Sequence, residues 1–226
     1  MAIILQAEDC CSGLLKRAHH WYIQGDASRG SVQLKKLNLG CGGKLLEGYV
    51  NVDVVASRSG LKPDVLCDLH ALSPFADNSV DEILSVHVVE HFWRWEVVGV
   101  LKEWVRVLKP GGCMILECPN LLTACEEFLR DPEAHAGPGA ESQRTMWVFY
   151  GDPEWKDPLM IHRWGYTPES LAQVMHEAGL VSLRQEPAQF KLREPRDMRI
   201  VGEKPGKQGS RVGAMFPFLG KLLANR

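Results

Sequence analysis

The sequence lacks four features that would each assign it to a broad class of protein. It has no C-x-x-C pair among its seven scattered cysteines, which argues against a zinc ribbon or a thioredoxin-like redox motif. It has no apolar run near the roughly 20 residues that span a membrane, and its start lacks the basic and apolar regions of a signal peptide. Its net charge of −2 is unlike that of a large nucleic-acid-binding surface. We therefore expect a reduced, cytoplasmic protein with an ordinary core.

Short apolar runs alternate with helical patterns along most of the chain, which favours an α/β protein with a mainly parallel sheet. Apolar residues at helical spacing predict a helix between Trp93 and Leu108, which Pro110-Gly111-Gly112 then ends. Thr167 is a typical N-cap for a helix that runs to Gly179, and a short helix is expected over 121–130. Strands are predicted near 35–39, 49–53, 64–67, 80–86, 112–117, 180–186 and 197–203, the last two as an antiparallel hairpin.

These elements place a core domain over 35–203, with an N-terminal helical extension over 1–34 and a C-terminal tail over 204–226. Residues 131–165 are rich in proline, glycine and tryptophan and show little periodicity, which is typical of a functional loop or lid. The tail carries the apolar residues Phe216, Phe218, Leu219, Leu222 and Leu223. We expect this segment to dock on the domain, and peripheral contact with a membrane or a partner is the weaker alternative. The oligomeric state is not indicated.

The run Leu37-Asn38-Leu39-Gly40-Cys41-Gly42-Gly43 is the most informative stretch of the chain, and a second apolar run then closes on Asp53. A buried strand, a glycine loop and an acid at the end of the next strand outline a nucleoside site. A dinucleotide loop needs a third small residue where Leu45 stands, which disfavours a nicotinamide oxidoreductase. Two glycines before a short helical turn suit a small anion such as a carboxylate.

Four blocks that follow one another in this order resemble the class I S-adenosylmethionine-dependent methyltransferases, and the resemblance extends over about residues 35–203. The blocks are 37–42, 67–69, 74–91 and 105–112, with Asp53 in register between the first two. The resemblance implies a Rossmann-like α/β fold with a seven-stranded, mostly parallel sheet, one antiparallel edge strand and helices on both faces. It also implies S-adenosyl-L-methionine as the cofactor and S-adenosyl-L-homocysteine as the product.

The same resemblance implies which residues bind the cofactor. Asp53 matches the acid that binds the ribose hydroxyls, and Asp68 matches the acid that contacts the adenine amino group. Members commonly carry an acid where Asn38 stands and a third glycine where Lys44 stands, so the contacts to the methionine end differ here. These departures keep open a non-catalytic module that only binds the cofactor. The implied cofactor site consists of Asn38, Gly40, Gly42, Asp53, Asp68, Leu69 and His87.

A competing motif lies at His87-Val88-Val89-Glu90-His91, which spells the H-x-x-E-H signature of a zinc hydrolase. On a long helix the two histidines would bind zinc while Glu90 activates water. Here the motif directly follows an apolar strand ending at Val86, and no third ligand follows in a helical setting. We therefore assign no metal site and keep a zinc-dependent hydrolase as the less favoured alternative.

The acceptor side is indicated by residues 161–169, which resemble a segment in a group of predicted bacterial methyltransferases. Members of the family place acceptor-contacting residues in this neighbourhood, and we predict His91, Arg163 and Trp164 as substrate-binding residues. Methyl transfer needs a general base only when the nucleophile arrives protonated, and His87 and His162 are the candidates for a hydroxyl acceptor. The near-neutral charge and the aromatic lid favour a small-molecule or carbohydrate-type acceptor.

Overall fold

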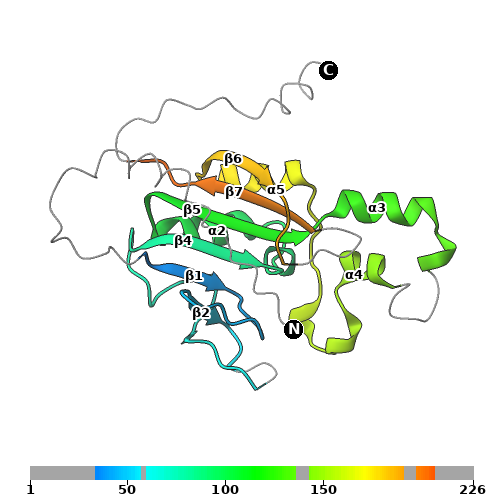
Figure 1. Ribbon diagram of the computed structural model, residues 1–226, viewed down its shortest axis with the longest axis horizontal. Coiled ribbons are helices and arrows are strands. Elements are labelled where there is room, and N and C mark those ends of the chain that lie inside the picture. The colour runs from blue at the N-terminus through cyan, green and yellow to red at the C-terminus, as the bar shows by residue number, and fades with distance from the viewer. Residues whose placement is uncertain (1–33, 57–59, 136–142, 191–196, 207–226) are drawn as a thin grey trace, which may run out of the picture. The chain divides into compact units, whose positions relative to one another are not determined.

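The computed structural model describes residues 34–56, 60–135, 143–190 and 197–206, and from Lys35 onward these belong to one compact unit. Its seven-stranded sheet has the order β3-β2-β1-β4-β5-β7-β6 (Figure 1). Strands β1 to β5 pair in parallel, whereas β7 runs antiparallel to both β5 and β6. This arrangement confirms the predicted seven-stranded, mostly parallel sheet, with its antiparallel strand β7 lying second from the edge. The strands are β1 (Lys36–Leu39), β2 (Val50–Asp53), β3 (Val65–Leu66), β4 (Val80–Val86), β5 (Leu108–Pro119), β6 (Val181–Glu186) and β7 (Asp197–Glu203).

The strand order reverses at β1, which pairs with β2 on one side and with β4 on the other. In a parallel α/β sheet, ligands bind in the crevice outside the carboxyl ends of the strands at such a reversal. Asp53 ends β2, and the glycine loop and His87 follow β1 and β4 directly. The topology therefore brings the predicted site residues to one edge of the sheet. The predicted N-terminal extension up to residue 33 and the tail from residue 207 lie outside the described residues.

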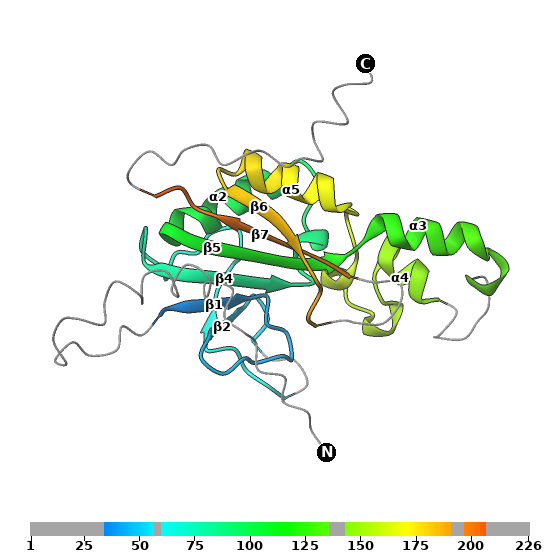
Figure 2. The ribbon, with the colours of Figure 1, turned by 45° about the horizontal axis from the view of Figure 1, so that its top comes forward.

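Helices α2 (Val97–Val107) and α5 (Pro168–Glu177) cover one face of the sheet, where they contact each other and the strands β5, β6 and β7 (Figure 2). Helix α2 buries five residues at helical spacing, namely Val97, Val100, Leu101, Trp104 and Val107. Helix α5 begins at a capping box, because the Thr167 hydroxyl accepts the Ser170 N–H while the Ser170 hydroxyl accepts the Thr167 N–H. Both helices confirm their predicted positions.

The described residues 121–135 and 143–165 form a lobe beyond the carboxyl end of β5 (Figure 1). Its parts are α3 (Leu121–Arg130), α4 (Arg144–Tyr150) and the 3₁₀ turns η2 (Glu133–His135), η3 (Pro153–Trp155) and η4 (Pro158–Met160). Helix α4 corrects the prediction of an irregular segment over 131–165, because the run Arg144–Tyr150 itself contains neither proline nor glycine. None of the described helices is long and apolar enough to span a membrane.

Trp104 connects this core to the edge of the sheet where the predicted site lies. Its side chain is fully buried between α2 and the sheet, and its ring packs edge-on against Phe92. Its indole Nε1–H donates to the carbonyl oxygen of Leu69 at 2.8 Å. The same residue therefore fills the core and fixes the segment after β3, where Asp68 and Leu69 are found.

We expect Trp104→Ala to lower the free energy of unfolding by about 3–5 kcal/mol, because it leaves a large cavity and an unpaired carbonyl. Chemical denaturation measures this change. Trp95→Ala is the matched control, since Trp95 is 76% exposed and its removal is expected to cost less than about 1 kcal/mol. Equal losses in the two variants would contradict the role given to Trp104.

Candidate functional site

The glycine loop after β1 has a backbone that only glycine adopts readily. Gly40 has a φ of +70° and Gly42 a φ of +52°. The N–H groups of Gly40 and Cys41 both donate to the carbonyl of Val52, which fixes the loop against β2. A Cβ atom on Gly40 would lie 2.3 Å from Cγ2 of Val88. The loop therefore has no room for a side chain at Gly40, and its backbone is open to close approach by a ligand.

Asp53 holds this loop from the end of β2. It is 6% exposed, and its Oδ2 accepts the N–H of Gly42 at 2.7 Å while its Oδ1 accepts the N–H of Val55 at 2.9 Å. Each carboxylate oxygen has more than one lone pair, so both can accept a further hydrogen bond. Asp53 thus combines a structural role with the capacity to bind a pair of hydroxyl groups.

Asn38, in β1, holds the same loop by hydrogen bonds from its side chain. It does not line the cavity described next, which corrects its predicted contact with the cofactor. Its Nδ2 donates to the carbonyl of Lys44 and to Oδ1 of Asn51, both at 2.9 Å. A carboxylate at this position could not donate either bond. The departure from the family's acid is therefore explained by how the loop is fixed.

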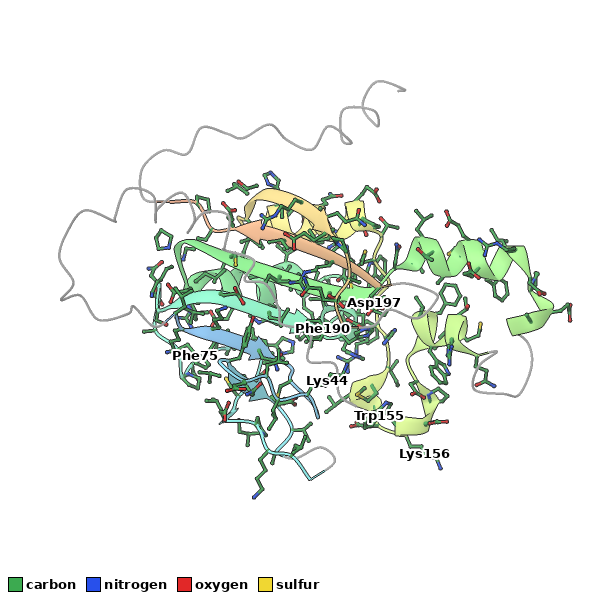
Figure 3. The ribbon with its side chains drawn as sticks, viewed as in Figure 1. Lys44, Phe75, Trp155, Lys156, Phe190 and Asp197 are labelled. Atoms are coloured by element: carbon green, nitrogen blue, oxygen red, sulfur yellow. The ribbon has the colours of Figure 1, made fainter. Side chains whose placement is uncertain are left out.

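One cavity of about 350 Å³ lies over the carboxyl ends of β1, β2 and β4. It brings together eight of the residues predicted for cofactor or substrate, namely Gly40, Gly42, Asp53, Asp68, Leu69, His87, His91 and Arg163. The opposite wall comes from the lobe, which contributes Trp155, Leu159 and Met160. Figure 3 shows Trp155 of this wall beside Lys44 of the glycine loop. The cavity is therefore closed on one side by the segment that the sequence predicts to be a lid.

Asp68 lies at the rim of this cavity and is more exposed than Asp53. Its Oδ1 accepts the backbone N–H of His70 at 2.9 Å, and that hydrogen bond and the His70 side chain lower the pKa of the carboxyl group. Asp68 is therefore charged at neutral pH. Leu69 beside it is held by the hydrogen bond from Trp104.

His87 lies in a left-handed backbone conformation, with a φ of +56°, and both of its ring nitrogens face carboxylates. Its Nε2 is 2.5 Å from Oδ2 of Asp197, and its Nδ1 is 3.1 Å from Oε1 of Glu90. Burial alone would lower the pKa of His87, but the contacts with Asp197 and Glu90 outweigh burial and raise the pKa to about 9. His87 is thus a cation near pH 7. This corrects its predicted role as a general base, although it lines the cavity as expected.

Glu90 and His162 lie behind the cavity wall. Burial would raise the pKa of Glu90, but the His87 cation holds it well below its usual range. His162 is placed next to Glu90, with its Nε2 3.9 Å from Oε1, and burial lowers the pKa of His162. His162 does not line the cavity, so its predicted role as a base that contacts the acceptor is not supported by its position.

The zinc-hydrolase alternative does not match this geometry. Residues Val89–His91 form the single 3₁₀ turn η1, and His87 precedes that turn at the end of β4. The two histidines of the H-x-x-E-H motif therefore do not share one helical face, and both nitrogens of His87 are engaged by carboxylates. The sequence alternative built on His87, Glu90 and His91 is wrong.

Arg163 and Trp164 were both predicted to contact the acceptor, and the structure separates them. Their backbone N–H groups both donate to the carbonyl of Glu90. The Arg163 side chain lines the cavity, donates to the carbonyl of His91 at 3.0 Å and lies over the ring of Trp93. Trp164 is 45% exposed and does not line the cavity. Only Arg163 is in place to meet a ligand.

Comparisons with known proteins agree with this geometry. Residues 37–116 match the family model for a methyltransferase domain. The chain is 27% identical over 162 residues to a ubiquinone biosynthesis O-methyltransferase of Parvibaculum lavamentivorans, covering 63% of this chain and 60% of that protein. A probable S-adenosylmethionine-dependent methyltransferase of Mycolicibacterium smegmatis is 38% identical over 50 residues, or 22% of this chain and 19% of that protein. The chain thus spans less than two thirds of the length of either relative.

Solved structures support the same fold. An S-adenosylmethionine-dependent methyltransferase from Archaeoglobus fulgidus has a TM-score of 0.50 and 18% identity, with 85% of this chain and 94% of that chain covered. One from Methanosarcina mazei has a TM-score of 0.51 and 18% identity, with coverage of 84% and 98%. At this identity the likeness concerns the fold, and the residue-level site depends on the geometry above.

The paired charges of His87 predict a dependence of stability on pH. Because the pKa of His87 is raised from 6.5 to about 9, its stabilisation is complete below pH 6.5 and is lost as the pH rises through 9. We expect the free energy of unfolding to fall over this interval by an amount on the order of 2–3 kcal/mol. In His87→Asn this fall should be absent, because asparagine tolerates the left-handed backbone but carries no charge.

Urea denaturation at several pH values between 6 and 9.5 measures this dependence. His176→Asn is the control, since His176 is an exposed histidine on α5. An unchanged pH profile in His87→Asn would show that His87 is not the titrating cation.

Proposed function

We propose that this chain, whose residues 37–116 match the family model for a methyltransferase domain, transfers the methyl group of S-adenosylmethionine to a hydroxyl group of a small organic molecule. The observation that carries the proposal is the single cavity that joins the glycine loop and Asp53 to the lobe residues Trp155 and Arg163. One space therefore brings residues predicted for the cofactor together with residues predicted for the acceptor.

The residues at the sheet edge fit the cofactor that the family uses. Val88 packs directly on Gly40, where a Cβ would lie 2.3 Å from its Cγ2, and the backbone of the glycine loop lines the cavity, where a ligand can touch it. Asp53 can accept hydrogen bonds from two ribose hydroxyls, and charged Asp68 can accept one from an amino group at the cavity rim. When bound, S-adenosylmethionine supplies a sulfonium methyl that is open to attack by a nucleophile.

The lobe supplies the surroundings for the acceptor. Leu159, Met160 and Trp155 offer apolar surface, and Arg163 offers a cation that can bind a polar or anionic group. Such a wall aligns two reactants and excludes water, which are the main contributions a protein makes to an in-line displacement. The O-methyltransferase named among the relatives supports oxygen as the accepting atom. A carbohydrate remains within this proposal as one class of hydroxyl-bearing molecule.

Two further expectations belong to this proposal. No disulfide joins the five described cysteines, which supports a reduced, cytoplasmic setting. The domain over 35–203, with the segment 131–165 as its acceptor-side lid, agrees with the compact unit that begins at Lys35.

Cofactor binding is tested with S-adenosylhomocysteine and NAD in titration calorimetry. We expect the wild-type chain to bind S-adenosylhomocysteine and not NAD. Gly40→Ala should weaken binding at least about tenfold, because a methyl group at Gly40 collides with Val88 and strains the positive φ, so the loop that lines the cavity must shift. Gly48→Ala is the matched control. Gly48 also has a positive φ, +79°, but a Cβ there meets no atom within 4 Å.

Circular dichroism and thermal melting establish that both glycine variants are folded before binding is compared. Equal binding by folded Gly40→Ala and Gly48→Ala would contradict the placement of the cofactor. Preferential binding of NAD would replace the methyltransferase proposal with the oxidoreductase alternative.

Methyl transfer is tested by the release of S-adenosylhomocysteine in the presence of phenols, aliphatic alcohols and sugars. We expect turnover with a hydroxyl-bearing class, and in Arg163→Ala a KM for the acceptor raised about tenfold, because a charge-assisted hydrogen bond is lost. Trp164→Ala should leave the KM unchanged, since Trp164 lies outside the cavity. Tight cofactor binding without turnover on any class would instead indicate the non-catalytic module.

A further inference from the structure

Two histidines pack against each other at the cavity, His91 in its wall and His162 behind it. The ring Nδ1 of His91 lies 3.1 Å from the carbonyl of Ile161, and the Nδ1 of His162 lies 3.0 Å from the carbonyl of Val148. A carbonyl oxygen only accepts, so each Nδ1 carries the proton and each Nε2 has a free lone pair when the ring is neutral. The two rings pack edge-on with centroids 5.0 Å apart. Metal-binding histidines are held in this way, with the second nitrogen donated to a carbonyl.

A carboxylate that lacks hydrogen bonds lies beside these two rings. Glu90 is 2% exposed, and neither of its side-chain oxygens has a hydrogen-bond partner among the described residues. Its one close partner is the ring of His87, whose Nδ1 lies 3.1 Å from Oε1 and whose Nε2 is engaged by Asp197. A buried carboxylate with so few partners is stabilised when a further cation joins its surroundings. One ligand atom from each of Glu90, His91 and His162 lies within 4.8 Å of the others.

We propose that Glu90, His91 and His162 bind one divalent transition-metal ion, with Zn²⁺ the best match, at the wall of the cavity. Two imidazole nitrogens and one carboxylate oxygen are a common zinc ligand set, and they leave a coordination position for another oxygen. Tetrahedral zinc holds its ligand atoms about 3.3 Å apart, so the three side chains approach one another when the ion binds.

This site differs from the H-x-x-E-H site that the geometry rejects. It does not use His87, which stays paired with Asp197, and it takes its third ligand from the lobe rather than from a helix after β4. The ligand His162 lies 71 positions beyond His91 in the sequence, so no local spacing signals the set. The metal would also fix the lobe segment at His162 to the turn η1, next to the cavity.

Because His91 lies in the cavity wall, a metal ion bound to it could activate the acceptor, and this role rests on the methyl transfer proposed above. An acceptor hydroxyl that binds the open coordination position loses its proton to water more readily. The resulting oxygen anion forms the new bond to the methyl carbon, and the carbon–sulfur bond breaks with its electron pair left on sulfur.

The test is metal binding by the full chain, measured after removal of metals with a chelator. We expect one Zn²⁺ per chain in titration calorimetry, and a Co²⁺ absorption spectrum with ligand-field bands and no thiolate charge-transfer band. His91→Ala and His162→Ala should each weaken binding at least about tenfold. His176→Ala on α5 is the matched control and should bind as the wild type does.

Thermal melting and S-adenosylhomocysteine binding establish that each variant is folded, and they separate this inference from the proposed function. Loss of metal with retained S-adenosylhomocysteine binding supports the site. No metal binding by the wild type, equal binding by all variants, or a thiolate band in the Co²⁺ spectrum would overturn it. Metal binding without any S-adenosylhomocysteine binding would keep the site and contradict the methyltransferase proposal instead.

Discussion

The buried carboxylate of Glu90 is the point on which the site depends. Its side chain compensates the charge of His87 at the end of β4, and its backbone carbonyl accepts the N–H groups of both Arg163 and Trp164. Glu90 therefore joins the end of the central strand to the returning end of the lobe. Because Arg163 and His162 lie within that returning segment, one residue of η1 determines where the acceptor wall lies relative to the sheet.

Burying the charged side chains of Glu90, Asp197 and His87 costs desolvation free energy. Two carboxylates, Glu90 and Asp197, face a single cation, His87. Both carboxylates are nearly inaccessible to solvent, and His87 is partly buried. Buried ion pairs often contribute little net stability, because desolvation offsets their attraction. What they provide is position. His87 holds a left-handed backbone conformation directly after β4, and the two carboxylates restrain its ring in the cavity wall. A second cation beside Glu90 would complete the balance of charge.

The sheet was readily predicted from sequence, and the connections within the site were not. Apolar runs indicate buried strands, and the glycine loop with Asp53 marks the site, because both are local patterns. The pairing of His87 with Asp197 joins residues 110 positions apart, and no local pattern carries that information. Composition identified the lid segment. The prediction selected Trp164 rather than Trp155 as the tryptophan that contacts the acceptor, because the sequence does not show the directions that the turns η3 and η4 give to the two side chains. Helix α4 was missed because the prolines and glycines around it dominated the composition.

Asn38 shows how a departure from a family pattern can be required by the local backbone. The interval between Gly40 and Asp53 contains no helix among its described residues, so no helical hydrogen bonds support the loop after Gly42. The side chains of Asn38 and Asn51 support the loop instead. The amide of Asn38 donates to the carbonyl of Lys44, and the side-chain oxygen of Asn51 accepts the N–H of Leu46. Asn51 is itself fixed by Asp64, whose Oδ2 accepts its amide at 2.9 Å. An acid in place of Asn38 would lose the bond to Lys44 and place a negative charge near the Oδ1 of Asn51. The short loop and the asparagine therefore belong together, and neither is explained without the other.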